Sequence, residues 1–133
     1  MYSIPGGHKI SFGVAAVCDP ALSTYGVTEW DKPCAPLSAP ISITATAWND
    51  ANGHPYVEFQ PALRFVPGSE VILFLKDKDA ADNPASTIEW CDASGQCVDE
   101  SVSQPSVITK RDTRNGVVYR LIKHFSGYHI TAG

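Results

Sequence analysis

Short apolar runs separated by turn-forming residues are the feature of this sequence that most restricts its fold. In residues 41–48 apolar and polar side chains alternate, which predicts a strand with one buried face. The turn dipeptide Asn52-Gly53 separates this run from another at residues 56–60, as in a β-hairpin. Turn signals recur at roughly the eight- to twelve-residue spacing typical of a β-sandwich, and the sequence has no helical period. We therefore predict an all-β fold, an antiparallel β-sandwich of about eight or nine short strands.

The length of the chain predicts a single domain spanning residues 1–133. Residues 70–75 are apolar almost throughout, which is typical of a central strand covered on both faces. A polar loop is expected at residues 76–85, whose acidic side chains lack the spacing of an EF-hand calcium site. The expected strands are residues 10–17, 41–48, 56–60, 70–75, 87–91, 97–100 and 106–109, and a last strand that begins at residue 116 and runs through residue 125 into residues 128–131.

Composition and charge exclude several classes of partner. The chain is 44% hydrophobic, which is ordinary for a globular protein, and its formal charge is −4. This charge argues against nucleic acid or an anionic membrane as a partner, because both select basic patches. No apolar run approaches the roughly 20 residues that span a bilayer, so we expect no membrane insertion. Residues 1–7 lack the basic start and apolar run of a signal peptide, so we expect a mature domain to which Met1 was added.

Four cysteines fall into two locally close pairs. Of the three possible connectivities, the sequence favours Cys18–Cys34 together with Cys91–Cys97, because the second pair flanks a short turn-like loop. The alternatives are four free buried thiols or a zinc site, which usually contains a C-x2-4-C pair that is lacking here. Disulfides indicate an oxidising compartment, so we expect a secreted or cell-surface protein. The first bridge would also order residues 19–40, a long connection with four prolines that is unsuited to regular structure.

Three chemically useful groups stand side by side near the C-terminus, in His124, Phe125 and Ser126. His124 and Ser126, two residues apart on a strand, would share a face. The imidazole could then take the Ser126 proton while Oγ attacks the carbonyl of Phe125, which exchanges an amide for an ester. The exchange is uphill unless the amide is distorted, and functional sites can store about 1–3 kcal/mol of backbone strain per residue. Gly127 would allow the unusual dihedral angles that such a bend requires.

The His124-Phe125-Ser126 triplet resembles the self-cleavage site of ZU5-type β-sandwich domains, in which the chain breaks between Phe and Ser. The resemblance covers the chain from about residue 41 onward and includes residues 59–65 and 71–75, which are similar to ZU5-related domains of bacterial exported proteins. It implies scission of the Phe125–Ser126 bond, with Ser126 as the nucleophile and His124 as the base. The C-terminal strand would remain bound to the rest of the domain after the cut.

The expected last strand places the groups of this site on two faces. Val117, Tyr119, Leu121 and Phe125 would share one face, with Phe125 as a core anchor that fixes the carbonyl. His124 and Ser126 would continue the other face. Reactants held in this way can reach effective molarities of about 10⁵–10⁸ M, which allows a hydroxyl to attack an amide.

Other chemistries have little support in the sequence. Nucleophile-elbow, zinc-protease and phosphate-loop motifs are missing, and His8, His54 and His129 are scattered, so we expect neither a metal nor a cofactor. Three tryptophans could form a sugar-stacking platform, although large aromatic residues more often fill a core. The alternative function is a passive extracellular interaction or adhesion module that binds carbohydrate or protein without being cut. At most, the chain is a single-turnover protease that acts on itself.

Overall fold

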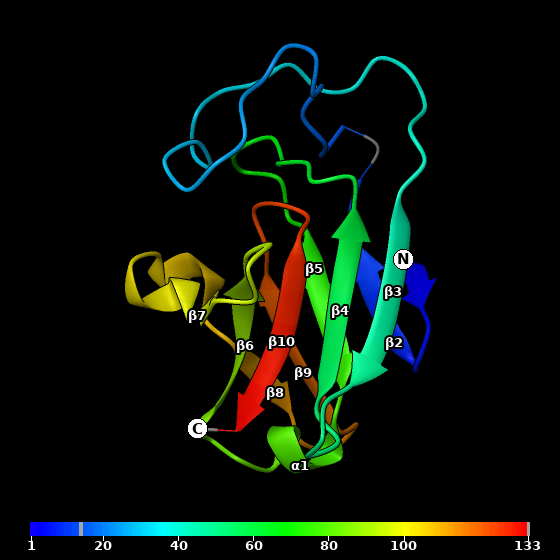
Figure 1. Cartoon of the computed structure of the whole chain (residues 1–133), viewed down its shortest axis with the longest axis vertical. Coiled ribbons are helices and arrows are strands. Elements are labelled where there is room, and N and C mark those ends of the chain that lie inside the picture. The colour runs from blue at the N-terminus through cyan, green and yellow to red at the C-terminus, as the bar shows by residue number, and fades with distance from the viewer. Residues whose placement is uncertain (14, 133) are drawn as a thin grey trace.

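Two antiparallel five-stranded sheets pack face to face in this chain (Figure 1). The structure, a computed structural model, describes residues 1–13 and 15–132. Its strands alternate between buried and more exposed positions, for example along β4 and β9, so that each sheet buries one face against the other. The predicted all-β sandwich is thereby confirmed, and its strands number ten in the described part of the chain.

The first sheet has the order β1-β2-β5-β9-β8. Its strands are β1 (Tyr2–Ile4), β2 (His8–Ser11), β5 (Ile72–Lys76), β8 (Lys110–Asp112) and β9 (Val117–Leu121). The second sheet has the order β3-β4-β10-β6-β7. Its strands are β3 (Thr44–Asn49), β4 (Pro55–Gln60), β6 (Ser86–Cys91), β7 (Cys97–Val98) and β10 (Gly127–Ala132).

Short helical turns fill some of the connections. They are the α-helix α1 (Lys78–Ala81) and the 3₁₀ turns η1 (Glu100–Val102) and η2 (Pro105–Val107). Helix α1 lies inside the expected polar loop, where the Asp77 carboxylate accepts a hydrogen bond from the Ala80 N–H at 3.1 Å and caps the turn. No helix in the described residues has the length and apolar character needed to cross a membrane.

Several predicted strands need correction. The strand expected at residues 106–109 is wrong, because Pro105 begins the η2 turn and β8 starts only at Lys110. The strand expected at residues 10–17 is shorter, since β2 ends at Ser11, and its position 14 lies outside the described residues. The prediction that residues 70–75 are covered on both faces is also wrong, because β5 alternates between fully and partly buried side chains. The hairpin around Asn52-Gly53 is confirmed by the pairing of β3 with β4.

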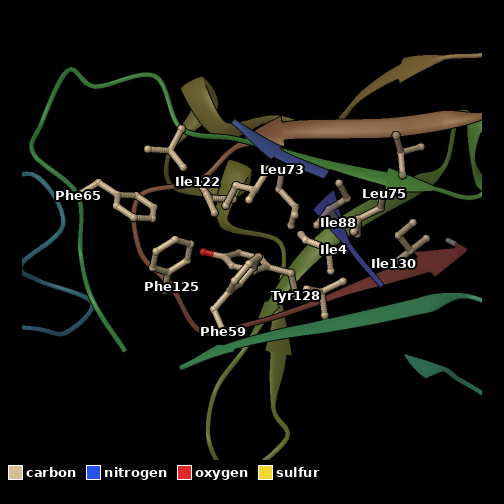
Figure 2. Close-up of a cluster of buried hydrophobic side chains, with 14 of the residues drawn as sticks. Ile4, Phe59, Phe65, Leu73, Leu75, Ile88, Ile122, Phe125, Tyr128 and Ile130 are labelled. Atoms are coloured by element: carbon tan, nitrogen blue, oxygen red, sulfur yellow. The ribbon is translucent and has the colours of Figure 1, made fainter. Parts of the chain in front are cut away.

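The core lies between the sheets (Figure 2). Leu73 and Leu75 of β5 are fully buried against Ile88 of β6 and Ile130 of β10, side chains from the facing sheet. Tyr128, Phe59, Phe65 and Phe125 continue this core toward one end, where Phe125 lies between aromatic neighbours (Figure 2).

The chain changes sheet between residues 122 and 126, which overturns the prediction of one continuous last strand. Strand β9 ends in the first sheet, and β10 begins in the second. The connection from β4 to β5 makes the opposite crossing, and the two crossings bond to each other. The Ile122 N–H donates to the Val71 carbonyl at 2.9 Å, and the Phe125 N–H donates to the Leu63 carbonyl at 2.6 Å. These bonds satisfy backbone groups that a continuous strand would have paired within one sheet.

Strand β10 is central in the second sheet. It pairs with β6 from Gly127 to Ala132 and with β4 on its other edge (Figure 1). The residues that follow the His124-Phe125-Ser126 triplet are therefore held by a ladder on both sides.

Candidate functional site

The crossover places His124, Phe125 and Ser126 at the corner between the two sheets. His124 and Phe125 are fully buried, whereas Ser126 is half-buried. The Phe125 ring packs against Phe59 and Phe65, with 4.7 Å between ring centroids in each pair, so it is the core anchor that was predicted. The predicted sharing of a face with Val117, Tyr119 and Leu121 is wrong, because the chain turns after β9 and the inward side chains of that strand are Val118 and Arg120.

The peptide unit between Phe125 and Ser126 and the units on either side of it are each held by one hydrogen bond. The Phe125 N–H donates to the Leu63 carbonyl, and the Ser126 carbonyl accepts from the Phe59 N–H at 3.0 Å. Between them, the Phe125 carbonyl oxygen accepts a hydrogen bond from the Tyr25 hydroxyl at 2.9 Å. A carbonyl fixed in this way keeps one orientation relative to the neighbouring serine.

Glu100 and Arg120 hold one side of the His124 imidazole. The ring Nε2 lies 2.8 Å from one Glu100 carboxylate oxygen, and the Arg120 guanidinium donates to the other at 2.7 Å. All three side chains are buried. Because a carboxylate can only accept, Nε2 carries the proton and Nδ1 is left as an acceptor in the neutral ring.

The free nitrogen of the imidazole faces two tyrosines. Nδ1 lies 3.5 Å from the hydroxyl of Tyr25 and 3.5 Å from that of Tyr128. Tyr128 donates its own proton to the His124 carbonyl at 2.5 Å. The Trp30 ring stacks on the imidazole with 3.8 Å between centroids, and Trp90 meets it edge-on. The ring is therefore fixed from every side.

Burial controls the charge of this cluster. Desolvation lowers the pKa of His124. The hydrogen bond and the electrostatic attraction from Glu100 act in the opposite direction, but the pKa remains below its ordinary value. Burial acts to raise the pKa of Glu100, but hydrogen bonds and charges from His124 and Arg120 lower it below its usual value. At neutral pH the site thus contains a neutral imidazole beside a carboxylate that is paired with arginine.

Ser126 does not bond directly to His124 in the described structure. Its Oγ accepts a hydrogen bond from the Trp90 indole N–H. It also bonds with the Tyr25 hydroxyl, whose pKa burial raises to about 12, against a lowering effect of that bond. Tyr25 therefore stands between the serine and the imidazole, where the sequence predicts direct contact. Catalytic hydrogen bonds are often long in a resting site and shorten during reaction.

Gly127 serves a different purpose from the one predicted. It is not among the glycines with positive φ, so it supplies no unusual dihedral angle. A Cβ at this position would lie 2.6 Å from the Tyr56 hydroxyl oxygen and 3.1 Å from a ring carbon of Tyr56. Glycine is therefore required at the start of β10 because there is no room for a side chain beside Tyr56.

The Ser126 side of the Phe125–Ser126 bond borders the surface. A surface hollow of about 420 Å³ lies in front of Ser126 and Gly127. Tyr25, Tyr56 and Trp90 line its walls. A hydrolytic step after attack by the serine would not require the core to open.

The disulfides Cys18–Cys34 and Cys91–Cys97 are confirmed, and both are compatible with a location outside the cytoplasm. No cysteine is left free, so the four-cysteine zinc site and the free thiols are excluded. The second bridge staples β6 to β7, as predicted.

The other histidines have partners outside the candidate site, whereas Trp30 and Trp90 meet edge to face there with 6.2 Å between ring centroids. His54 and His129 each lie 2.7 Å from a carboxylate, of Asp77 and Asp50 respectively, and the His8 ring accepts from the Lys76 N–H. The tryptophans form no common platform: Trp30 is buried against His124, Trp90 borders Ser126, and Trp48 lies on the outer face of β3.

Sequence reasoning missed the residues that reach the site from far along the chain, which are Tyr25, Trp30, Glu100 and Arg120. Tyr25 and Trp30 lie in a proline-bearing loop and Glu100 in a short turn, where no local pattern marks them. Arg120 carried one signal, an arginine at an inward position of an otherwise apolar strand, which requires a buried anion as partner.

Comparisons with family models, with curated proteins and with solved structures give no match for this chain, so the functional argument depends on the geometry of the site.

Proposed function

We propose that this domain cuts its own Phe125–Ser126 peptide bond, with Ser126 as the nucleophile and His124 as the base. The observation that carries the proposal is the environment of the Phe125 carbonyl. Its oxygen accepts a hydrogen bond from the Tyr25 hydroxyl, and the peptide units on both sides are hydrogen-bonded to neighbouring backbone. A hydroxyl nucleophile, a neutral imidazole and a hydrogen-bond donor thus surround one amide. The resemblance of the triplet to ZU5-type self-cleavage sites agrees with this assignment.

The reaction consists of an acyl shift and a hydrolysis. Oγ of Ser126 attacks the carbonyl carbon of Phe125 as its proton moves to Nδ1 of His124. The C–N bond then breaks, the proton passes to the departing nitrogen, and that nitrogen becomes the α-amino group of Ser126. Water from the adjacent hollow hydrolyses the ester, which leaves a carboxylate on Phe125 and restores the Ser126 hydroxyl.

The environment of His124 suits a general base. Its lowered pKa keeps the imidazole neutral at pH 7, and Glu100 fixes the tautomer that leaves Nδ1 free. The carboxylate also stabilises the imidazolium that forms once the ring takes a proton.

The C-terminal segment is expected to remain in place after the cut. Residues 127–132 pair with β4 and β6, so the fragment that begins at Ser126 keeps its ladder hydrogen bonds when its covalent link is lost. The partner of the domain is then its own last strand, and an exported, oxidising location suits a protein with two bridges.

Intact mass under denaturing conditions tests the proposal. Purified protein should resolve into a chain that ends at Phe125 and a peptide that begins at Ser126, whereas native mass spectrometry should show one species with the mass of both. Ser126→Ala should stay uncut and folded, at a cost of about 1 kcal/mol from the lost Trp90 bond. Ser42→Ala, at an exposed position, should cut like the wild type. A wild-type chain that stays whole across pH 6–9 would reject self-cleavage.

An exposed aromatic row favours a second candidate function, binding by the outer face of the second sheet. Trp48 of β3, Tyr56 of β4 and His129 of β10 occupy facing positions on three adjacent strands. Trp48 is 48% exposed and stacks on Tyr56 with 4.5 Å between centroids. Flat groups of this kind suit a sugar ring. Retention on immobilised oligosaccharides that Trp48→Ala abolishes would support this function, and equal retention of the variant would reject it.

A further inference from the structure

Tyr25 reaches the scissile carbonyl from a loop that belongs to neither sheet. Residues 19–33 form this loop, seen at the end of the sandwich where β4 ends and β3 begins (Figure 1). The loop contributes the Tyr25 hydroxyl at 2.9 Å from the Phe125 oxygen and the Trp30 ring that stacks on His124. Half of the environment of the scissile bond therefore comes from one irregular segment.

Two ties hold this loop on the sandwich. The Cys18–Cys34 bridge closes its ends. The buried Arg64 guanidinium donates to the carbonyls of Thr24 and Lys32, each at 2.6 Å, and thereby fixes the loop interior. Beyond the bridge, the N–H of Cys18 donates to the Arg64 carbonyl at 2.9 Å. The bridge thus joins the loop to the strand-like segment that carries Arg64.

We propose that Tyr25 is a catalytic residue of the cut, as the donor to the oxyanion that forms on Phe125, and that the cut depends on the Cys18–Cys34 bridge because the bridge holds Tyr25 in place. This inference rests on the proposed self-cleavage and adds both a residue and a redox requirement to it.

The position of the Tyr25 hydroxyl suits an oxyanion donor. It already bonds to the carbonyl oxygen that becomes negative when Ser126 attacks, and burial of the oxyanion beside it strengthens that bond. Its raised pKa, about 12, keeps the phenol protonated at neutral pH, so Tyr25 donates a hydrogen bond and does not act as the base. This assignment leaves proton removal to the neutral imidazole of His124.

The Cys18–Cys34 bridge forms by ordinary thiol–disulfide exchange. The Cys18 and Cys34 thiols lose two electrons and two protons to a disulfide oxidant such as oxidised glutathione, which leaves as two thiols. A dithiol reductant reverses the step, and the half-buried Cys34 gives it access. Without the bridge, only backbone hydrogen bonds hold the ends of the loop together, from the Asp19 N–H to the Ala35 carbonyl at 2.8 Å and from the Leu37 N–H to the Val17 carbonyl at 2.9 Å. The unbridged chain has more conformational entropy, so the precise placement of Tyr25 is lost. The domain would then stay whole in a reducing compartment and cut itself after export.

Removal of one hydroxyl tests the role of Tyr25. Tyr25→Phe keeps the ring against Trp30 but lacks the donor, so we expect the rate of cutting to fall about 10²–10³-fold. Tyr119→Phe, which changes a half-buried tyrosine on β9 away from the site, should cut at the wild-type rate. Equal rates for Tyr25→Phe and the wild type would overturn the role of Tyr25.

Refolding under two redox conditions tests the dependence on the bridge. Wild-type chain is recovered still whole from insoluble aggregates formed in a reducing cytoplasm, and is denatured and reduced. It is then refolded with either oxidised glutathione or a phosphine reductant, and cutting is followed by denaturing mass spectrometry. Cutting should occur only in the oxidised sample. The double variant Cys91→Ser/Cys97→Ser should behave like the wild type, whereas Cys18→Ser/Cys34→Ser should stay uncut in both. Amide NMR spectra of the uncut samples should show the β4–β10 ladder intact. If Cys18→Ser/Cys34→Ser does not fold, the wild type refolded with the phosphine decides whether cutting depends on the bridge.

The outcomes separate the two proposals. A wild-type chain that cuts equally fast with and without the bridge keeps self-cleavage and overturns the redox requirement. A wild-type chain that remains whole in the oxidised sample rejects self-cleavage itself, and the requirement falls with it.

Discussion

At the scale of single residues, the state of His124 decides what the site can do. The ring is neutral because burial lowers its pKa, and it is oriented because Glu100 takes Nε2–H. The pKa of Glu100 is lowered by its hydrogen bond with His124 and by Arg120, against desolvation, so Glu100 stays ionised. The Arg120 guanidinium also donates to the Ile88 carbonyl at 3.1 Å. Three buried polar side chains thus satisfy one another, which is the condition for tolerating them in an apolar core.

We predict that His124→Ala slows the cut by roughly 10²–10⁴-fold, the usual contribution of a general base. Added imidazole should restore part of the rate, because the substitution leaves a space between Trp30 and Trp90 that the free base can enter. The rate in the wild type should also fall as pH drops through the lowered pKa of His124, which lies below 6.5, because the ring then becomes protonated; the variant should lack this dependence. Cutting is followed by denaturing mass spectrometry. A variant that imidazole cannot rescue at any concentration would argue for a structural role alone.

The sequence predicts the contiguous residues of the candidate site and gives little sign of the remote residues that surround them. His124, Phe125 and Ser126 are neighbours, so their chemistry can be read from one segment. Tyr25 comes to the same place through the Cys18–Cys34 loop, and Glu100 through a turn beyond the second bridge. Contacts of this kind are fixed by tertiary packing, for which no local pattern exists.

At the scale of elements, the corner between β9 and β10 determines the geometry of the Phe125–Ser126 bond. Alternation predicted β4 and β6 well, since each has one buried face in a sheet. The strand expected at residues 41–48 starts later, as β3 at Thr44, and its inward side chains are only partly buried. The crossing at residues 122–126 could not be predicted in this way, because Leu121, Ile122 and Phe125 are apolar whether or not the chain changes sheet. The crossing also replaces the direct contact between His124 and Ser126 that a regular strand would impose.

We predict that Gly127→Ala destabilises the domain by about 1–3 kcal/mol, the usual cost of overpacking. The new methyl group would meet the Tyr56 hydroxyl oxygen at 2.6 Å, and Tyr56 is restrained by its stacking on Trp48. Gly13→Ala is a matched control, because a Cβ there meets no atom within 4 Å. Urea denaturation in the uncut Ser126→Ala background measures both changes.

Relief by a second substitution would identify the cause. Tyr56→Phe removes the closest atom, so it should recover part of the stability lost in Gly127→Ala. Additive effects of Gly127→Ala and Tyr56→Phe would contradict the steric explanation and point back to a requirement for backbone freedom.

At the scale of the whole molecule, the cluster of His124, Glu100 and Arg120 lies between the two sheets and links them. Arg120 extends from β9 of the first sheet, whereas Ile88, whose carbonyl accepts from it, belongs to β6 of the second. The protonation of this cluster therefore bears on the stability of the entire sandwich, and with it on the retention of β10 after a cut.

Acid should weaken the sandwich in two steps. The pKa of His124 is lowered in the folded state, so between that value and 6.5 the unfolded chain binds more protons and stability falls as pH falls. The pKa of Glu100 is also lowered, so its contribution is present above 4.5 and is lost as pH falls through the folded value. His8, whose pKa burial lowers, adds to the first step. Tyr25 and Tyr128, which also face His124, have raised pKa values and stay neutral throughout.

Urea unfolding of Ser126→Ala at pH values between about 4 and 8 measures this prediction. The unfolding free energy should decline below pH 6.5, and Ser126→Ala/His124→Gln should show a smaller decline there, because only the lowered pKa of His8 still contributes to it. In the cut wild type, the same acid range should release the peptide that begins at Ser126, since β10 is then held only by noncovalent contacts with β4 and β6. Identical pH dependence with and without His124 would show that its burial does not couple proton binding to folding.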